Sequence, residues 1–320
     1  AQRAALPMTA DQAAPSPAVT GLLMRRATRA SIAVAVVMVA VKLGAWLLTD
    51  SVSLLSSLLD SLLDLAASVV NLVAVHQALT PADREHRFGH GKAEPLASLG
   101  QSAFIAGSAL VLLIQALQHL LTPAPVSHAD VGLAVMGFAI VVTLVLVRYQ
   151  NYVVRRTGSL VVSADELHYR SDLVLNGSVI VSLIATNLVG WAAIDPLFGG
   201  AIGLWIIYGA WRVAQKAIVQ LMDRELPDEA RGRIRALALA HPQVRSVHDL
   251  RTRAAGPNAF VQVHLEMDGD LTLSEAHRIS DAVEADILAA FPNAEVMIHQ
   301  DPVGVEEPRR SFPPRRVGGS

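Results

Sequence analysis

Two pairs of metal-ligating side chains stand four residues apart in apolar parts of the sequence. Asp60 and Asp64 lie in SLLSSLLDSLLDLAAS, and His168 and Asp172 lie in ELHYRSD. Residues four apart project from the same face of a helix, so each segment presents one paired set. If the two segments converge, their three carboxylates and one imidazole suit a tetrahedral site for Zn²⁺ or a similar ion. We therefore predict a four-ligand metal site from Asp60, Asp64, His168 and Asp172.

Each pair also has a simpler interpretation. The two aspartates could lie at a membrane interface or pair with Lys42, and a single histidine such as His168 is more often a helix-end residue than a ligand. A charged Asp near mid-bilayer costs about 2.5–3.5 kcal/mol on insertion scales. Because two apolar segments each carry a matched pair, the combination favours the metal site.

Two further groups of metal-ligating residues lie outside the apolar segments. In PADREHRFGHGKAE, Asp83, His86 and His90 stand at ligand spacing, and the alternative is a solvated loop. The other group is in the C-terminal part, where the alternative is a set of scattered surface histidines. Its members are His241, His248, His264, His277, His299 and Asp301. His76, His119, His128 and His241 have no evident partners and are interpreted as structural or solvated.

Composition places these groups in a membrane protein. The 320-residue chain is 52% hydrophobic and only 17% charged, with a mean hydropathy of +0.41, whereas soluble domains average about 25% charged residues. The absence of cysteine limits any metal site to nitrogen and oxygen ligands. A net charge of −2 argues against a nucleic-acid partner.

Six apolar segments approach the length of about 20 helical residues that crosses a bilayer. They are Ala30–Leu48, Val52–Leu79, Leu96–Leu121, Val131–Val147, Val161–Ile194 and Pro196–Met222. Lysine and arginine gather before the first segment, after the second, after the fourth and after the sixth. The positive-inside rule then places both termini in the cytoplasm.

The chain divides into four parts by composition. Residues 1–28 are rich in Ala, Pro and Arg and are predicted to be a disordered cytoplasmic tail, with no cleaved signal peptide. Residues 29–222 are predicted to form a transmembrane domain, and 223–302 a cytoplasmic metal-binding domain. Residues 303–320, rich in Pro and Arg, are predicted to be a second disordered tail.

The cytoplasmic part shows a helix–strand–strand–helix–strand pattern. The expected elements are Asp228–Ala240, Ser246–Arg253, Ala259–Met267, Ser274–Phe291 and Ala294–Gln300, with Gly256-Pro257-Asn258 as the hairpin turn. The predicted fold is therefore an all-α six-helix transmembrane bundle followed by a cytoplasmic α+β domain that resembles the ferredoxin-like fold.

From about Ala27 to Pro302 the chain resembles the cation diffusion facilitator family. The resemblance rests on SLLDSLLDLAAS, FGHGKAE, LHYRSD, DRELPDE, HDLRTR, HLEM and IHQDP in the expected order. These motifs are unrelated to one another, so chance agreement is remote.

The resemblance implies three metal sites and a homodimer. The transport site would be Asp60, Asp64, His168 and Asp172, and the loop site Asp83, His86 and His90. A binuclear cytoplasmic site would use His248, His264, His277 and His299, with Asp301 as the bridge. Lys92 and Asp223 match a charge pair that ties the third helix to the cytoplasmic domain. Members of the family are V-shaped homodimers, and the location implied is the bacterial inner membrane.

The predicted function is that of a secondary active transporter, not an enzyme. It would export Zn²⁺ or Fe²⁺ in exchange for protons by alternating access, and the ligands are equally compatible with Cd²⁺, Co²⁺ and Ni²⁺. The alternatives are an intramembrane aspartyl hydrolase, which would not need His168 beside Asp172, and a passive cation channel. A pump driven by ATP is disfavoured because the sequence has no Gly-x-x-x-x-Gly-Lys-[Ser/Thr] loop.

Overall fold

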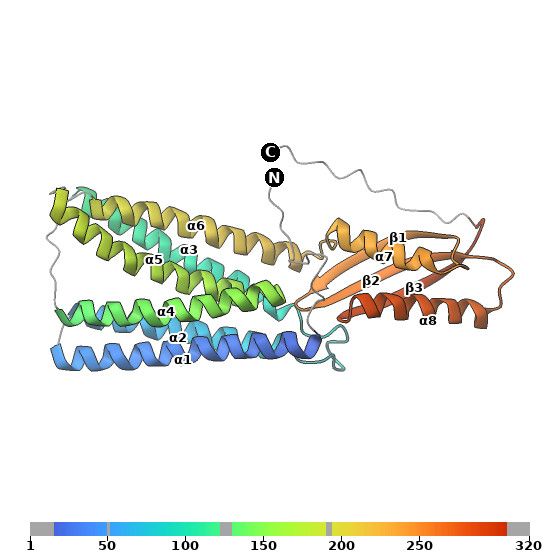
Figure 1. Ribbon diagram of the computed structural model, residues 1–320, viewed down its shortest axis with the longest axis horizontal. Coiled ribbons are helices and arrows are strands. Elements are labelled where there is room, and N and C mark those ends of the chain that lie inside the picture. Colours follow the sequence, from blue (N-terminus) through green and yellow to red (C-terminus); the bar gives the residue numbers. More distant parts are fainter. Residues whose placement is uncertain (1–15, 50–51, 122–129, 190–193, 306–320) are drawn as a thin grey trace. The chain divides into compact units, whose positions relative to one another are not determined.

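The computed structural model describes residues 16–49, 52–121, 130–189 and 194–305 (Figure 1). The chain separates into two compact units, with the division between Leu221 and Met222. The first unit contains long helices, and the second contains a small sheet with two helices.

Six helices make up the first unit. They are α1 Pro17–Thr49, α2 Val52–Ala78, α3 Ala93–Leu121, α4 Asp130–Thr157, α5 Leu160–Val189 and α6 Ile194–Leu221. Five of them, all except α5, are apolar enough over a sufficient length to cross a membrane. The first half of α5 carries Asp165, Glu166, Arg170 and Asp172, which lower its hydropathy. A helical membrane region is thus confirmed, and a crossing by α5 stays a prediction.

The first helix begins before the position that the sequence predicts. The predicted disordered tail over residues 1–28 is wrong for residues 17–28, which belong to α1. Pro17 stands in the first turn, where its missing N–H and fixed φ cost nothing, and the leucines, methionine and arginines that follow are good helix formers. In the same way, α4 continues past Val147 to Thr157. Residues 1–15 and 306–320 lie outside the described residues.

Helix α5 contacts α2, α3, α4 and α6, and in Figure 1 it runs between α6 and α4. Leu167 packs against α3 and α6, and Val161 packs against α1 and α2. Val162 and Tyr169 pack against α1 and α4. Asp165 and Glu166 are buried among these helices, whereas the side chains of Arg170 and Asp172 are 41% and 35% exposed. The neighbouring helices therefore shield only part of the charge on α5.

The second unit is an α+β domain with a three-stranded sheet. Its elements are α7 Asp228–Ala240, β1 Ser246–Ala255, β2 Asn258–Met267, α8 Leu273–Ala290 and β3 Ala294–Pro302. The strand order is β1-β2-β3, with β1 and β2 antiparallel and β2 and β3 parallel. The predicted order of elements is confirmed. Gly256, at a φ of +58°, makes the tight turn of the hairpin between β1 and β2.

One face of this sheet is apolar and the other carries histidines. Val261, Val263 and Leu265 are buried in a core with residues of α7 and α8. Each such side chain contributes about 1.5–3 kcal/mol by burial. Because successive residues of a strand point to opposite faces, His264 and Glu266 project from the face away from that core. The strand pattern thus separates the core of the domain from its metal-ligating residues.

Candidate functional site

Asp64 on α2 and His168 and Asp172 on α5 lie close together within the helical unit. Nε2 of His168 is 2.9 Å from Oδ1 of Asp64 and 3.7 Å from Oδ2 of Asp172. One ligand atom from each residue lies within 4.8 Å of the others. His168 is buried and both carboxylates are partly buried. This arrangement, with two oxygens and one nitrogen converging, suits a divalent metal ion.

Asp60 and Lys42 lie beside this group without joining it. Asp60, one turn before Asp64 on α2, is exposed and is not among the three residues whose ligand atoms converge. Lys42 of α1 instead donates hydrogen bonds from Nζ to the carbonyl of Ser57, at 3.0 Å, and to Oγ of Ser61, at 2.6 Å. Within the described residues, the alternative pairing of Lys42 with the aspartates is not formed.

A buried polar network lies one helical turn before His168. Asp165 accepts hydrogen bonds from Oγ of Ser31 on α1 at 2.5 Å, Nδ2 of Asn71 on α2 at 3.0 Å, and Nε2 of Gln150 on α4 at 2.6 Å. All four residues are at most 1% exposed. One carboxylate therefore ties α5 to three neighbouring helices close to the metal-ligating group. Its charge within an apolar segment was the only sequence signal, and nothing in the spacing identified its partners.

A second buried carboxylate holds the start of α5. Glu94 of α3 is 2% exposed. Its Oε1 accepts hydrogen bonds from Oγ of Ser159 at 2.5 Å and from the backbone N–H of Leu160 at 2.7 Å. A carboxylate is stabilised at a helix N-terminus by the unpaired N–H groups and the helix dipole. Sequence analysis did not single out Glu94, because a cap supplied from 65 residues away leaves no local pattern.

The loop between α2 and α3 brings Asp83, His86 and His90 together. Oδ1 of Asp83 is 3.5 Å from Nδ1 of His86, and Oδ2 is 3.4 Å from Nε2 of His90. The backbone N–H of His86 donates to Oδ1 of Asp83 at 2.6 Å. This bond, with a second from the N–H of Glu85, holds the pKa of Asp83 below its ordinary value. The carboxylate is thus kept ionised, as metal binding requires.

Three histidines form a row across the exposed face of the sheet. His248 on β1 pairs with His264 on β2, and His264 pairs with His299 on β3. Two residues further along β2 and β3, on the same face of the sheet, Glu266 is aligned with Asp301. The order of β1-β2-β3 therefore places side chains from three separate segments within contact distance.

Asp301 is the centre of this cluster. Its Oδ2 is 2.9 Å from Nδ1 of His264 and 3.2 Å from Nε2 of His248, while its Oδ1 is 3.1 Å from Nε2 of His299. A carboxylate whose two oxygens face different histidines has the geometry to bridge two metal ions. The ligand atoms that all converge belong to His248, His264 and Asp301; His299 pairs with Asp301 and is not among them. His277 also stays outside, exposed on α8, with Nε2 3.6 Å from Oδ2 of Asp281.

A charged pair at an irregularity within β1 borders the same cluster. Asp249 adopts a φ of +43° at the irregularity in strand pairing that follows His248. Both carboxylate oxygens of Asp249 accept hydrogen bonds from the guanidinium of Arg251. These bonds lower the pKa of Asp249, so the carboxylate stays negative beside the histidine row.

The predicted charge pair between Lys92 and Asp223 joins the two separate units and stays a prediction. Within its own unit, Oδ2 of Asp223 lies 3.5 Å from Nη1 of Arg253.

Comparison with known proteins decides the family. Residues 28–222 match the cation efflux transmembrane domain, and residues 226–303 match the cation efflux protein cytoplasmic domain. The chain belongs to the cation efflux family. This confirms the predicted membership of the cation diffusion facilitators, and it makes the chain a multi-pass membrane transporter for cations rather than an enzyme.

Similar transporters cover most of the chain. The cation-efflux pump FieF of Klebsiella pneumoniae is 50% identical over 285 residues, which cover 89% of this chain and 95% of the pump. FieF of Cronobacter sakazakii is 50% identical over the same share of both chains. A solved structure of the zinc form of the transporter CzrB is 40% identical and covers 27% of this chain and 98% of its own, with a TM-score of 0.25.

Proposed function

We propose that this cation efflux transporter exports a divalent transition-metal ion, Zn²⁺ or Fe²⁺, from the cytoplasm in exchange for protons. The approach of Asp64, His168 and Asp172 within 4.8 Å carries the proposal. These residues lie on two helices of the unit that matches the transmembrane domain. Asp60, one turn away, is proposed as the fourth ligand once an ion has drawn the site together.

Proton exchange follows from the atoms that the ion would need. Nε2 of His168 and Oδ1 of Asp64 are 2.9 Å apart, a hydrogen-bond distance that supports a proton shared between the two atoms. Metal ligation requires the same two atoms to be deprotonated, so the ion and the proton compete for one position. An ion that enters from the cytoplasm releases protons, and protons from the other side displace the ion.

The proposed transport also requires a particular arrangement of the helices in the membrane. All six helices of the first unit, α5 included, would cross the bacterial inner membrane, with both termini in the cytoplasm. Rocking of helices around the buried site would alternate its access between the two sides. The second unit, proposed to be ferredoxin-like, would lie in the cytoplasm and associate with its copy in a homodimer.

The two other metal-ligating groups have separate proposed roles. The loop group of Asp83, His86 and His90 would bind an ion near the cytoplasmic end of α2 and α3. The cluster around Asp301 would bind two ions, with His277 as a further ligand, and would stabilise the dimer of cytoplasmic domains when cytosolic metal is plentiful.

The decisive experiment is Zn²⁺ uptake into proteoliposomes with an imposed pH gradient. We compare the native chain with Asp64→Ala and with the control Glu166→Gln, which neutralises a different carboxylate on α5 that pairs with Arg170 at 3.6 Å. Gradient-driven, saturable uptake that is lost only in Asp64→Ala is expected. Uptake that does not depend on the pH gradient would indicate a channel. Equal uptake by the native chain and both variants would contradict the proposed site.

A further inference from the structure

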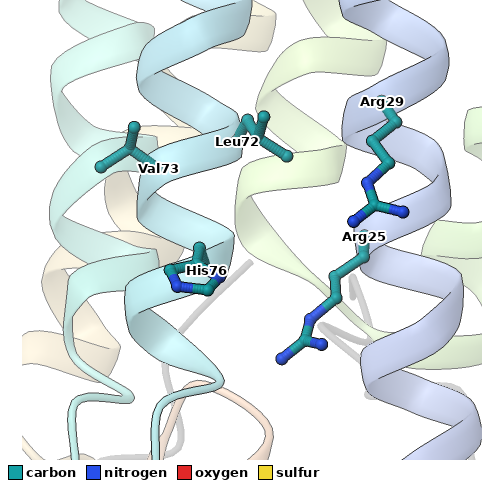
Figure 2. Close-up of a pocket in the computed structure, with 5 residues that line it drawn as sticks. All are labelled: Arg25, Arg29, Leu72, Val73 and His76. Atoms are coloured by element: carbon teal, nitrogen blue, oxygen red, sulfur yellow. The ribbon is translucent and has the colours of Figure 1, made fainter.

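A groove of about 310 Å³ lies between α1 and α2, and none of its lining residues belongs to the three metal-ligating groups. It is lined by Arg25 and Arg29 of α1 and by Leu72, Val73 and His76 of α2 (Figure 2). The two arginines stand one helical turn apart and extend from α1 into the space that faces α2. His76 belongs to the last turn of α2, so the groove opens at the end of the helices beside the loop of residues 79–92.

The cationic groups of this groove have no acidic partner in the described part of the chain. Neither arginine forms an ion pair there, and the imidazole of His76 forms no hydrogen bond. All three side chains are exposed. Two positive charges and a third potential donor therefore face one space, and none of the described acidic residues pairs with them.

The other wall of the groove is apolar. Leu72 is half-buried, and Val73 is 62% exposed. Val69, one turn further along α2, is 44% exposed. Both α1 and α2 are apolar enough over a sufficient length to cross a membrane, and in a bilayer this exposed apolar surface would be available to lipid chains. The groove thus joins a cationic end at the level of the headgroups to an apolar wall that continues into the hydrocarbon region.

We propose that this groove binds one anionic phospholipid. Arg25 and Arg29 would clamp the phosphate, since a guanidinium fork matches phosphate oxygens in a bidentate manner. His76 would donate a further hydrogen bond to the headgroup. Leu72 and Val73 would pack against the upper part of an acyl chain. Basic pockets between helices at the cytoplasmic end are known to select anionic headgroups in this way.

The apolar wall selects a lipid over free phosphate. Inorganic phosphate would use the two arginines but would leave Leu72 and Val73 in contact with water. A phospholipid satisfies both parts of the groove, and its local concentration in the bilayer is far higher than that of a soluble anion. The inference does not depend on which cation the protein transports or on proton exchange.

The test is native mass spectrometry of the full chain in detergent, titrated with phosphatidylglycerol or with phosphatidylethanolamine. We compare Arg25→Gln/Arg29→Gln with the control Arg26→Gln/Arg148→Gln, which removes the same net charge from exposed positions on α1 and α4 outside the groove. Each Arg near an anionic surface contributes about 1 kcal/mol, so the groove variant should bind phosphatidylglycerol roughly 10- to 30-fold more weakly.

The control should bind phosphatidylglycerol as the native chain does, and phosphatidylethanolamine should bind weakly to all three. Equal weakening in both double variants would mean diffuse attraction to basic residues and would overturn the proposal. So would no weakening in either. Displacement of the lipid by inorganic phosphate would identify a small-anion site instead. If the groove variant does not fold, the single variants Arg29→Gln and His76→Gln replace it. Each should bind phosphatidylglycerol more weakly than the native chain does, and unchanged binding would count against the site.

Discussion

Nε2 of His168 lies 2.9 Å from Oδ1 of Asp64, although 104 residues separate the two along the chain. The contact joins α5 to α2, and Asp172 approaches the same nitrogen from one turn further along α5. An imidazole and two carboxylates that converge on one point suit the binding of a cation better than the stabilisation of the fold. An apolar contact would hold the two helices together without the cost of desolvating charged groups.

Replacement of His168 by Gln should abolish transport while the protein remains folded. The variant removes the nitrogen that both carboxylates face, and loss of a ligand should exceed the 10- to 100-fold effects typical of residues that only support ligands. We expect kcat/KM for Zn²⁺ uptake to fall by more than about 100-fold. The matched control is His119→Gln at the exposed end of α3, which should transport as the native chain does. Similar losses in both would argue against a specific role for His168.

Asp165 should contribute to the stability of the fold, although it is not one of the proposed ligands. Asp165→Ala leaves the buried amide of Asn71 without its acceptor and leaves the amide of Gln150 only Oγ of Ser31, at 2.9 Å. The free energy of unfolding should fall by about 2–5 kcal/mol. The check is the thermal unfolding midpoint in detergent without added metal, with Glu85→Gln in the exposed loop as the control. An unchanged midpoint would mean that the network does not hold α5 in place.

These residues show what sequence can and cannot predict. Because residues four apart share a helix face, the sequence predicts that Asp60 and Asp64 form one pair and His168 and Asp172 another. The six apolar segments are predicted from their length and hydropathy, and the order of the α+β domain from its strand and helix patterns. Pairing across helices does not follow from any local rule, so Glu94 and the partners of Asp165 went unnoticed. The start of α1 was misplaced because helix propensity continues into polar sequence, where hydropathy gives no signal.

Glu94 should control the order of the first turn of α5. In Glu94→Ala, the backbone N–H of Leu160 loses its acceptor, and removal of a cap costs about 0.5–2 kcal/mol. Hydrogen exchange at Leu160 and Val161 should therefore quicken, while exchange in the centre of α5 stays slow. Glu85→Ala, in the exposed loop, provides the control. Unchanged protection at Leu160 would contradict a capping role.

The turn around Asp83 should be insensitive to pH across the physiological range. Backbone hydrogen bonds from His86 and Glu85 lower the pKa of Asp83 in the folded chain. A lowered pKa means that the ionised group stabilises the turn above the ordinary aspartate pKa of about 3.9, and that this contribution is lost only as pH falls through the lower folded value.

Amide exchange at Glu85 and His86, corrected for intrinsic rates, tests this expectation. Protection should be the same at about pH 7 and about pH 5, because both lie above the ordinary pKa of aspartate. Asp83→Asn should lose protection at both, since a neutral amide is a weaker acceptor than a carboxylate. Protection that declines in the native chain between these two pH values would show that another group controls the turn.

Lys42 should limit how tightly the proposed transport site binds a metal ion. Its ammonium group is bound at Ser61, which follows Asp60 directly and precedes Asp64 by one turn, so a fixed positive charge stands beside the carboxylates. A nearby cation repels a divalent ion, and Lys42→Met removes that repulsion while preserving side-chain length. We expect KM for Zn²⁺ to fall by roughly tenfold, on the order of 1.4 kcal/mol, with slower turnover because release becomes harder. Lys216→Met on α6, which neutralises a lysine outside the group, is the control. A higher KM in Lys42→Met would instead mean that the lysine helps to hold the site in shape.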